Sequence, residues 1–169
     1  MIPEAYYKDI FSIDYKNLKK VGIKNIFFDV DNTIVPYDEN IIDSKTKKLF
    51  ETLKKDFNIM LMSNSRSKRV LSFADDLKID GYYSSMKPLK KNYKKILKKY
   101  KSNECIFIGD QFMTDVKGAK RMNLRIILVD RINDKEPIYT RFWRFFERRL
   151  LKKIKNKFEI GKYYDNVKW

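Results

Sequence analysis

The sequence contains no histidine, a single cysteine, five glycines and four prolines in 169 residues. Without histidine, a general acid or base that works near neutral pH must be a carboxylate, a lysine, a tyrosine or the cysteine. Serine–histidine catalytic triads and histidine-ligated zinc sites are therefore excluded. The single cysteine, Cys105, excludes an intramolecular disulfide, and its place at the start of the apolar run 105–108 is typical of a small buried residue.

Long apolar runs are also absent. No stretch approaches the roughly 20 apolar residues that a transmembrane helix needs. Residues 1–5 lack the basic start and apolar core of a signal peptide. We therefore expect a cytoplasmic protein, which can still associate peripherally with a membrane. Hydrophobic residues make up 43% of the chain and aromatic residues 15%, which indicates one globular domain with a sizeable core.

Acidic residues are few relative to basic ones. The 22 Asp and Glu against 38 Lys and Arg give a formal net charge of +16, which favours anionic partners such as phosphates, nucleic acid or acidic lipid. An AT-rich genome would by itself enrich lysine, so part of this charge carries no functional information. Genome composition explains the arginines less readily, because four of the nine lie together at positions 141, 144, 148 and 149.

Short apolar runs alternate with amphipathic segments over the first 135 residues. Runs bounded by turn residues predict buried strands at 24–30, 59–62, 81–85, 106–108 and 125–129. Helices are predicted within 1–23, from 44 to about 55, around 70–77, around 89–100 and from 115 to about 122. This alternation predicts an α/β fold with a parallel sheet and right-handed crossovers. We expect a catalytic domain over residues 1–138 and a basic extension over residues 139–169.

Polar side chains follow four of the predicted strands. Asp29 and Asp31 end the first strand, where open α/β sheets place their ligands. The later strands are followed by Ser63-Asn64, by Lys87-Pro88, and by Gly109-Asp110 with Thr114-Asp115. Each motif alone is weak, because such residues also form ordinary turns. The set is specific, because every member lies at the carboxyl end of a strand and hence at one edge of the sheet.

These residue types suit phosphoryl transfer. A phosphate monoester and a carboxylate nucleophile are both anions, so a cation must lie between them. Asp29, Asp31 and Asp110 together supply hard oxygen ligands of the kind that Mg²⁺ takes. Hydroxyl, amide and ammonium groups of the same loops can then bind the phosphate oxygens. The predicted phosphate-binding residues are Thr33, Ser63, Asn64 and Lys87.

The four motifs resemble those of the haloacid-dehalogenase (HAD) superfamily of phosphohydrolases over about residues 24–130. The resemblance implies a HAD-like Rossmannoid three-layer fold with five parallel strands in the order 3-2-1-4-5. It implies that Asp29 attacks phosphorus and becomes an aspartyl-phosphate, while Asp31 protonates the leaving alcohol and then activates water. It places Mg²⁺ on the carboxylates of Asp29 and Asp110 and on the backbone carbonyl of Asp31. Asp115 would orient the water shell of the metal or the ammonium of Lys87.

The intervals that could hold a cap domain over this site are short. There are 34 positions from Asp29 to Ser63 and 24 from Ser63 to Lys87. One loop, one helix and one strand fill the first interval, and one helix and one strand fill the second. We therefore expect a capless, open site, which suits a phosphate carried on a protein, a nucleic-acid end or a lipid surface. A small substrate is a further alternative, because a partner subunit can cover a capless site.

The motif versions and the small size are similar to subfamily IIIA, and within it to the YqeG-like and phosphatidylglycerophosphate phosphatases. Residues 3–24 and 140–147 resemble the flanking segments of that group, whereas Ile34 replaces its usual leucine. The resemblance implies an Mg²⁺-dependent phosphatase that converts phosphatidylglycerophosphate to phosphatidylglycerol at a membrane surface. Two alternatives stay open: a phosphatase of nucleic-acid ends or soluble phosphate esters, and a non-catalytic basic module that binds RNA or ribosomes.

Residues 141–158 form an amphipathic pattern at helical spacing, with Trp, Phe and Leu on one side and Arg and Lys on the other. Such a helix is typical of an element that lies on an anionic membrane surface. A terminal helix that packs on the sheet domain with a charged outer face explains the pattern nearly as well. The residues predicted to contact a membrane or a polyanion are Arg141, Trp143, Arg144, Arg148, Arg149 and Lys152.

Overall fold

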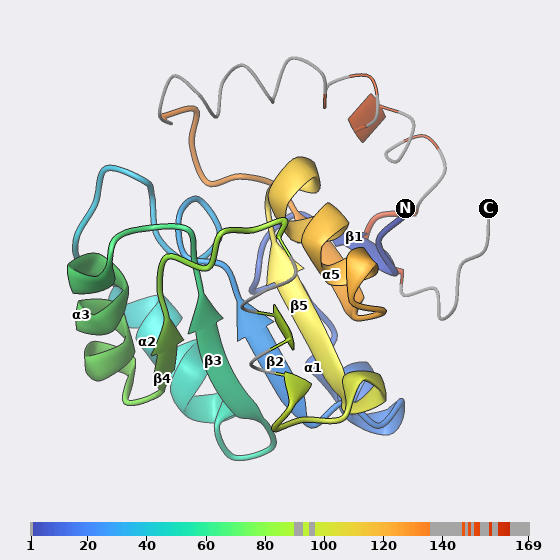
Figure 1. The fold of residues 1–169 in the computed structure, drawn as a ribbon, viewed down its shortest axis with the longest axis horizontal. Coiled ribbons are helices and arrows are strands. Elements are labelled where there is room, and N and C mark those ends of the chain that lie inside the picture. Colours follow the sequence, from blue (N-terminus) through green and yellow to red (C-terminus); the bar gives the residue numbers. More distant parts are fainter. Residues whose placement is uncertain are drawn as a thin grey trace.

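The computed structural model describes residues 2–89, 93–94, 97–135, 147, 149, 151–152, 156 and 159–162. This part of the chain contains a six-stranded parallel sheet in the order β1-β6-β5-β2-β3-β4 (Figure 1). The strands are β1 (Ala5–Tyr7), β2 (Asn25–Phe28), β3 (Asn58–Met62), β4 (Asp80–Tyr82), β5 (Cys105–Gly109) and β6 (Arg125–Val129). The predicted α/β class and the predicted order of the five later strands are confirmed.

The prediction of five strands was wrong, because β1 adds a sixth at the edge of the sheet. Ala5 pairs with Ile127 and Tyr7 with Val129 in parallel register, and the three residues of β1 are buried. Three residues are too few to show a strand periodicity, so no pattern in the sequence indicated this element. The helix predicted in the same segment is α1 (Tyr15–Lys20), whose first turn is capped by the carboxylate of Asp14.

Helices cover both faces of the sheet. The core on one face unites side chains of α1, α2 (Ser44–Leu53) and α3 (Ser67–Leu77) with Ile26 and Phe28 of β2. The core on the other face unites Phe27 with the π-helical turn η2 (Phe112–Val116) and α5 (Lys117–Arg121). A short 3-10 turn, η1 (Ser102–Glu104), precedes β5. Because side chains of β2 alternate between two helical layers, the strand is apolar from Ile26 to Phe28 after the buried Asn25, and the three-layer prediction is confirmed.

The intervals around the site contain no cap domain. Between β2 and β3 the chain forms one loop and α2, and between β3 and β4 it forms α3. Figure 1 shows the loops that follow β2, β4 and β6 above the strand arrowheads, at the carboxyl edge of the sheet. None of the helices in the described part of the chain is long and apolar enough to span a bilayer.

Described tail residues contact the catalytic core, and the backbone N–H of Gly161 donates to the carbonyl oxygen of Tyr6 at 3.0 Å. Glu147 is buried, and its carboxylate accepts a hydrogen bond from the backbone N–H of Met113 at 2.5 Å. Leu151 packs against the same core face as α5, while Arg149 and Lys152 are exposed. Of the residues predicted to contact a membrane, Arg141, Trp143, Arg144 and Arg148 lie outside the described residues. The predicted boundary near residue 138 stays a prediction.

Candidate active site

The strand order brings the ends of β2 and β5 together at the centre of the sheet. The two strands pair directly, with Phe28 opposite Ile108. The backbone N–H of Asp29 continues this pairing by donating to the carbonyl oxygen of Ile108 at 2.9 Å. Asp29 and Asp110 therefore leave neighbouring strands one residue beyond their ends. This is the topological switch point, where open parallel sheets place their ligands.

A tight turn after Asp29 sets the direction of the next side chains. The N–H groups of Thr33, Ile34 and Val35 all point to the carbonyl oxygen of Val30, at 3.3, 3.0 and 3.3 Å. The turn needs a left-handed residue at position 32, and Asn32 supplies it with φ of 61°. Asparagine tolerates this conformation better than most residues. The local sequence thus fixes a turn that presents its polar side chains at the edge of the sheet.

Three carboxylates and one ammonium group form the centre of the site. Oxygens of Asp29, Asp110 and Asp115 all lie within 4.8 Å of one another. The Lys87 Nζ atom lies 2.5 Å from Asp29 Oδ1 and 2.6 Å from Asp115 Oδ1. The Thr33 hydroxyl is 3.5 Å from Asp29 Oδ2 and 3.3 Å from Asp110 Oδ1. All five residues are buried, so these charges interact in a region of low dielectric constant.

The charges in this cluster do not balance. Burial raises the pKa of Asp29 well above its usual value; the Lys87 ammonium opposes this shift, and Asp115, Asp110 and Asp31 add to it. Burial also works to lower the pKa of Lys87, but the carboxylates of Asp115 and Asp29 outweigh it and raise that pKa. Lys87 therefore stays a cation. Three carboxylates and one ammonium leave a surplus of negative charge, and this oxygen donor set fits a divalent metal ion.

Asp115 differs from the other two acids because both of its oxygens have protein partners. Its Oδ1 accepts from Lys87, and its Oδ2 accepts from the backbone N–H of Gln111 at 3.0 Å. Its carboxyl group packs directly on Gly109, where a Cβ atom would lie only 2.5 Å from Oδ2. A glycine is therefore required before Asp110. Asp115 thus contacts the Lys87 ammonium directly, and its predicted role in orienting Lys87 or the water shell of a metal stays a prediction.

Asp31 lies outside the acidic cluster and has its own partners. Its carboxylate accepts hydrogen bonds from the Ser65 hydroxyl and from Arg69 Nε, the latter at 3.1 Å. The Ser63 hydroxyl lies 3.5 Å from the same carboxylate. Neither Ser65 nor Arg69 was predicted. Ser65 adjoins the Ser63-Asn64 motif and could have been suspected, whereas Arg69 reaches Asp31 only because α3 packs beside the loop.

The side chain of Asn64 contacts the backbone of Lys87. Asn64 Nδ2 donates to the Lys87 carbonyl at 3.1 Å, and the Lys87 N–H donates to Asn64 Oδ1 at 2.7 Å. The loop after β3 thereby holds the loop after β4 at a fixed position. The prediction that Ser63 and the Asn64 amide bind phosphate stays a prediction, and this side-chain contact adds a positioning role for Asn64.

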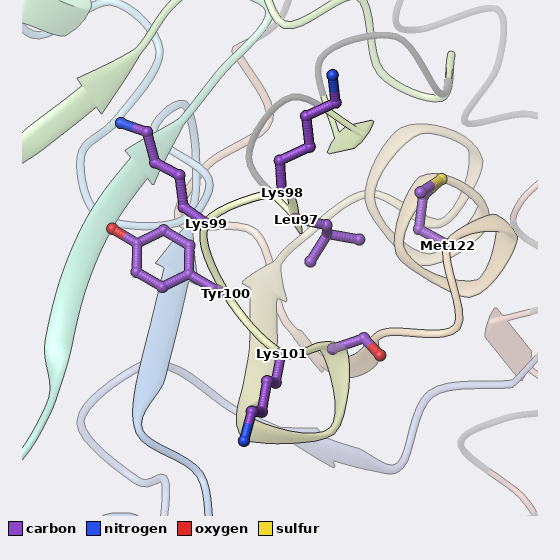
Figure 2. A pocket seen from close by; sticks show the side chains of 7 residues that line it. Leu97, Lys98, Lys99, Tyr100, Lys101 and Met122 are labelled. Atoms are coloured by element: carbon purple, nitrogen blue, oxygen red, sulfur yellow. The ribbon is translucent and has the colours of Figure 1, made fainter.

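A separate surface hollow of about 430 Å³ lies near the start of β5, at the other end of the strands (Figure 2). Its walls come from the segment 97–102 and from Met122. Figure 2 shows the ammonium groups of Lys98, Lys99 and Lys101 pointing in different directions. The hollow contains no carboxylate and no pair of groups suited to acid–base chemistry. The acidic cluster therefore remains the candidate active site.

Solved structures with the same fold are found in several bacteria. An uncharacterized protein from Listeria monocytogenes serotype 4b aligns with a TM-score of 0.53 and 16% identity, over 79% of this chain and 99% of its own. A predicted HAD-like hydrolase from Porphyromonas gingivalis gives 0.54 and 16%, over 73% and 98%. The HAD-hydrolase YfnB from Bacillus subtilis, solved with bound magnesium, gives 0.55 and 14%, over 68% and 89%. These similarities establish the fold.

Sequence comparison establishes the family. A family model described as HAD-hydrolase-like matches residues 86–136, the segment that carries Lys87, Asp110 and Asp115. The probable phosphatase YqeG from Bacillus subtilis (strain 168) is 33% identical over 162 residues, which cover 94% of each chain. With its sheet order and its acidic cluster in place, the chain belongs to the HAD superfamily of hydrolases as a YqeG-like phosphatase.

Proposed function

We propose that the protein is an Mg²⁺-dependent phosphomonoester hydrolase that works through an aspartyl-phosphate on Asp29 and acts on phosphatidylglycerophosphate at a membrane surface. One observation carries the proposal: Asp29 is buried beside Lys87 and Asp110 at the switch point of the sheet, and the described chain between β2 and Lys87 forms no cap domain over it. The buried cluster supports the chemistry, and the absence of a cap supports a substrate presented on a surface.

The contacts of Asp29 suit a nucleophile. Lys87 binds one carboxylate oxygen and Thr33 lies beside the other, so the side chain is held in one orientation before substrate arrives. A bond forms between an Asp29 oxygen and phosphorus while the bond from phosphorus to the leaving alcohol oxygen breaks. The ammonium of Lys87 stabilises the negative charge on the phosphoryl oxygens during this step.

Asp31 suits the proton transfers. It gives a proton to the leaving alcohol oxygen and then takes one from the water that hydrolyses the aspartyl-phosphate. Ser65 and Arg69 fix the direction of its carboxylate. The chain contains no histidine, which leaves a carboxylate as the natural group for this task.

The residues that would hold Mg²⁺ are Asp29 and Asp110 through their carboxylates and Asp31 through its backbone carbonyl. The metal would neutralise charge on the phosphoryl oxygens. Asp115 keeps the Lys87 ammonium beside Asp29, because both of its oxygens already accept hydrogen bonds. Phosphatidylglycerophosphate is the proposed substrate, because an uncovered site and a net charge of +16 suit a phosphate on an anionic surface.

Mg²⁺ is expected to stabilise the folded protein, because it relieves the repulsion among three buried carboxylates. At about 100 times its dissociation constant it should add about 2.7 kcal/mol to the free energy of unfolding, which raises Tm by roughly 5–10 °C. Differential scanning fluorimetry with and without Mg²⁺ measures the shift. In Asp110→Asn the shift should vanish, whereas the exposed surface variant Asp80→Asn should keep it. An equal shift in Asp110→Asn would place the metal elsewhere.

A phosphate-release assay across three substrate classes tests the proposed substrate. The expected kcat/KM on phosphatidylglycerophosphate in vesicles exceeds that on a 5′-phosphorylated oligonucleotide or a sugar phosphate by at least about tenfold, since the site is open and cationic surroundings favour an anionic surface. Higher turnover of the oligonucleotide or the sugar phosphate would contradict the lipid substrate and favour a phosphatase of nucleic-acid ends or soluble phosphate esters. Absence of turnover with every substrate, with Mg²⁺ present, would favour the non-catalytic RNA-binding alternative.

A further inference from the structure

The exposed apolar side chains of this protein are unevenly distributed. Within the described ranges, eight large apolar residues are exposed. Two of them, Leu71 and Ile160, lie on α3 and in the tail. The other six lie in loops that follow carboxyl ends of strands: Tyr37, Ile41, Tyr83, Met86, Leu89 and Ile132. Single exposed apolar residues are normal, but this concentration at the edge that carries Asp29 needs a physical reason.

Hydrogen bonds connect these loops around the active site. The loop after β6 binds the loop after β2, because the N–H of Ile132 donates to the carbonyl of Asn32 at 3.1 Å and Lys135 pairs with Asp38 at 2.6 Å. The loop after β4 binds the end of β3, where the N–H of Ser85 donates to the carbonyl of Ser63 at 2.9 Å. Figure 1 shows all three loops on the side to which the arrowheads of β2, β3 and β5 point.

We propose that the six exposed apolar residues form an apolar rim that docks the open active site onto an anionic lipid bilayer. The inference rests on the proposed lipid substrate and adds the surface that would bring the site to it. Apolar side chains that enter the boundary between headgroups and acyl chains gain free energy, while the site between them faces the headgroups.

A bilayer fits this rim better than a folded partner does. The apolar residues come from three separate loops and not from one helix or one edge strand, so they suit a fluid surface that adapts to separate points of insertion. The net charge of +16 adds long-range attraction to an anionic leaflet. Stable attachment of a peripheral protein generally needs both an apolar and a basic contribution.

The tail supplies basic groups at the same edge. Glu147 is anchored to Met113, which follows the carboxyl end of β5, and its neighbours Arg149 and Lys152 are exposed. Leu151 instead packs on the core. Among the described residues between 147 and 152, the apolar side chain packs on the protein and the basic ones are exposed, so the proposal takes the apolar contribution from the rim and adds the charge of these tail residues.

The test compares vesicle binding of the full chain and its rim variants. Ile41, Leu89 and Ile132 are 76%, 49% and 47% exposed, and each comes from a different loop. The triple variant I41S/L89S/I132S should bind vesicles of phosphatidylcholine and phosphatidylglycerol about a hundredfold more weakly than the wild type in sedimentation. Turnover of soluble para-nitrophenyl phosphate should not change.

A matched pair of single variants tests whether vesicle binding depends on the position of an exposed apolar residue in the rim or on exposed apolar surface in general. Leu89→Ser should weaken vesicle binding several-fold, whereas Leu71→Ser, at 40% exposure on α3, should not. The proposal is overturned if the wild type does not sediment with anionic vesicles. It is also overturned if the triple variant binds these vesicles as tightly as the wild type does, whether or not the variant loses RNA binding. Equal loss of para-nitrophenyl phosphate turnover would also overturn it, because the residues would then support the site itself.

The result of the vesicle-binding test does not depend on the proposed substrate, because sedimentation with vesicles requires no turnover. Rim-dependent vesicle binding without hydrolysis of phosphatidylglycerophosphate would refute the proposed function and support the rim. Hydrolysis of this lipid in vesicles at equal rates by wild type and triple variant would support the function and refute the rim.

Discussion

Replacing Asp29 with asparagine is expected to lower kcat on para-nitrophenyl phosphate by at least about a thousandfold, because the amide cannot form an aspartyl-phosphate. The substitution keeps the size of the side chain and its place beside Lys87. A phosphate-release assay at saturating Mg²⁺ measures the effect. Asp75→Asn, which changes an exposed carboxylate on α3, is the control and should retain full activity.

The stability of Asp29→Asn separates a catalytic loss from unfolding. Burial and the neighbouring acids raise the pKa of Asp29, so the fold favours its uncharged form. A carboxyl group with a raised pKa in the folded state costs stability once the pH exceeds its unfolded value of about 4. Without metal at neutral pH, the asparagine variant should therefore unfold at the same urea concentration as the wild type or a higher one. An inactive variant that is also unfolded, or a folded variant with normal kcat, would contradict the assignment.

Replacing Lys87 with methionine is expected to lower the free energy of unfolding by about 3–5 kcal/mol, because it leaves Asp29 and Asp115 buried without their shared cation. The same change should abolish most activity by removing the ammonium beside the nucleophile. Urea unfolding without metal measures the first effect. Lys24→Met, which breaks the exposed 2.8 Å ion pair with Glu104, should cost less than about 1 kcal/mol.

A double variant tests the electrostatic origin of this loss. If the penalty of Lys87→Met arises from unpaired carboxylates, the further change Asp115→Asn should restore part of the stability and give a coupling energy of about 1–3 kcal/mol. Activity should not return, because the phosphoryl oxygens still lack the ammonium. Purely additive effects on unfolding would show that the loss does not arise from the pairing of Lys87 with Asp115, and would favour its cation–π contact with Phe107 as the cause.

The central strands and their order were predictable because β2 and β5 lie between two helical layers and carry the continuous apolar runs 26–28 and 105–108. Such runs stand out against the polar turns that follow them, which also marked Asp29, Asp31 and Asp110. The strand β1 was missed because three residues form no periodic pattern. The contacts of Arg69 with Asp31 and of Glu147 with Met113 depend on how elements pack, across 38 and 34 positions of sequence, and no local pattern encodes them.

The position of Lys87 has a consequence for the entropy of catalysis. The Asn64 side chain holds both backbone groups of Lys87, while Asp29 and Asp115 hold its ammonium. A lysine on a loop ordinarily loses much of its rotamer freedom when it binds an anion. Here that freedom is already lost when the chain folds. Substrate binding therefore orders little of the protein, and the free energy of the phosphate contacts remains available for the transition state.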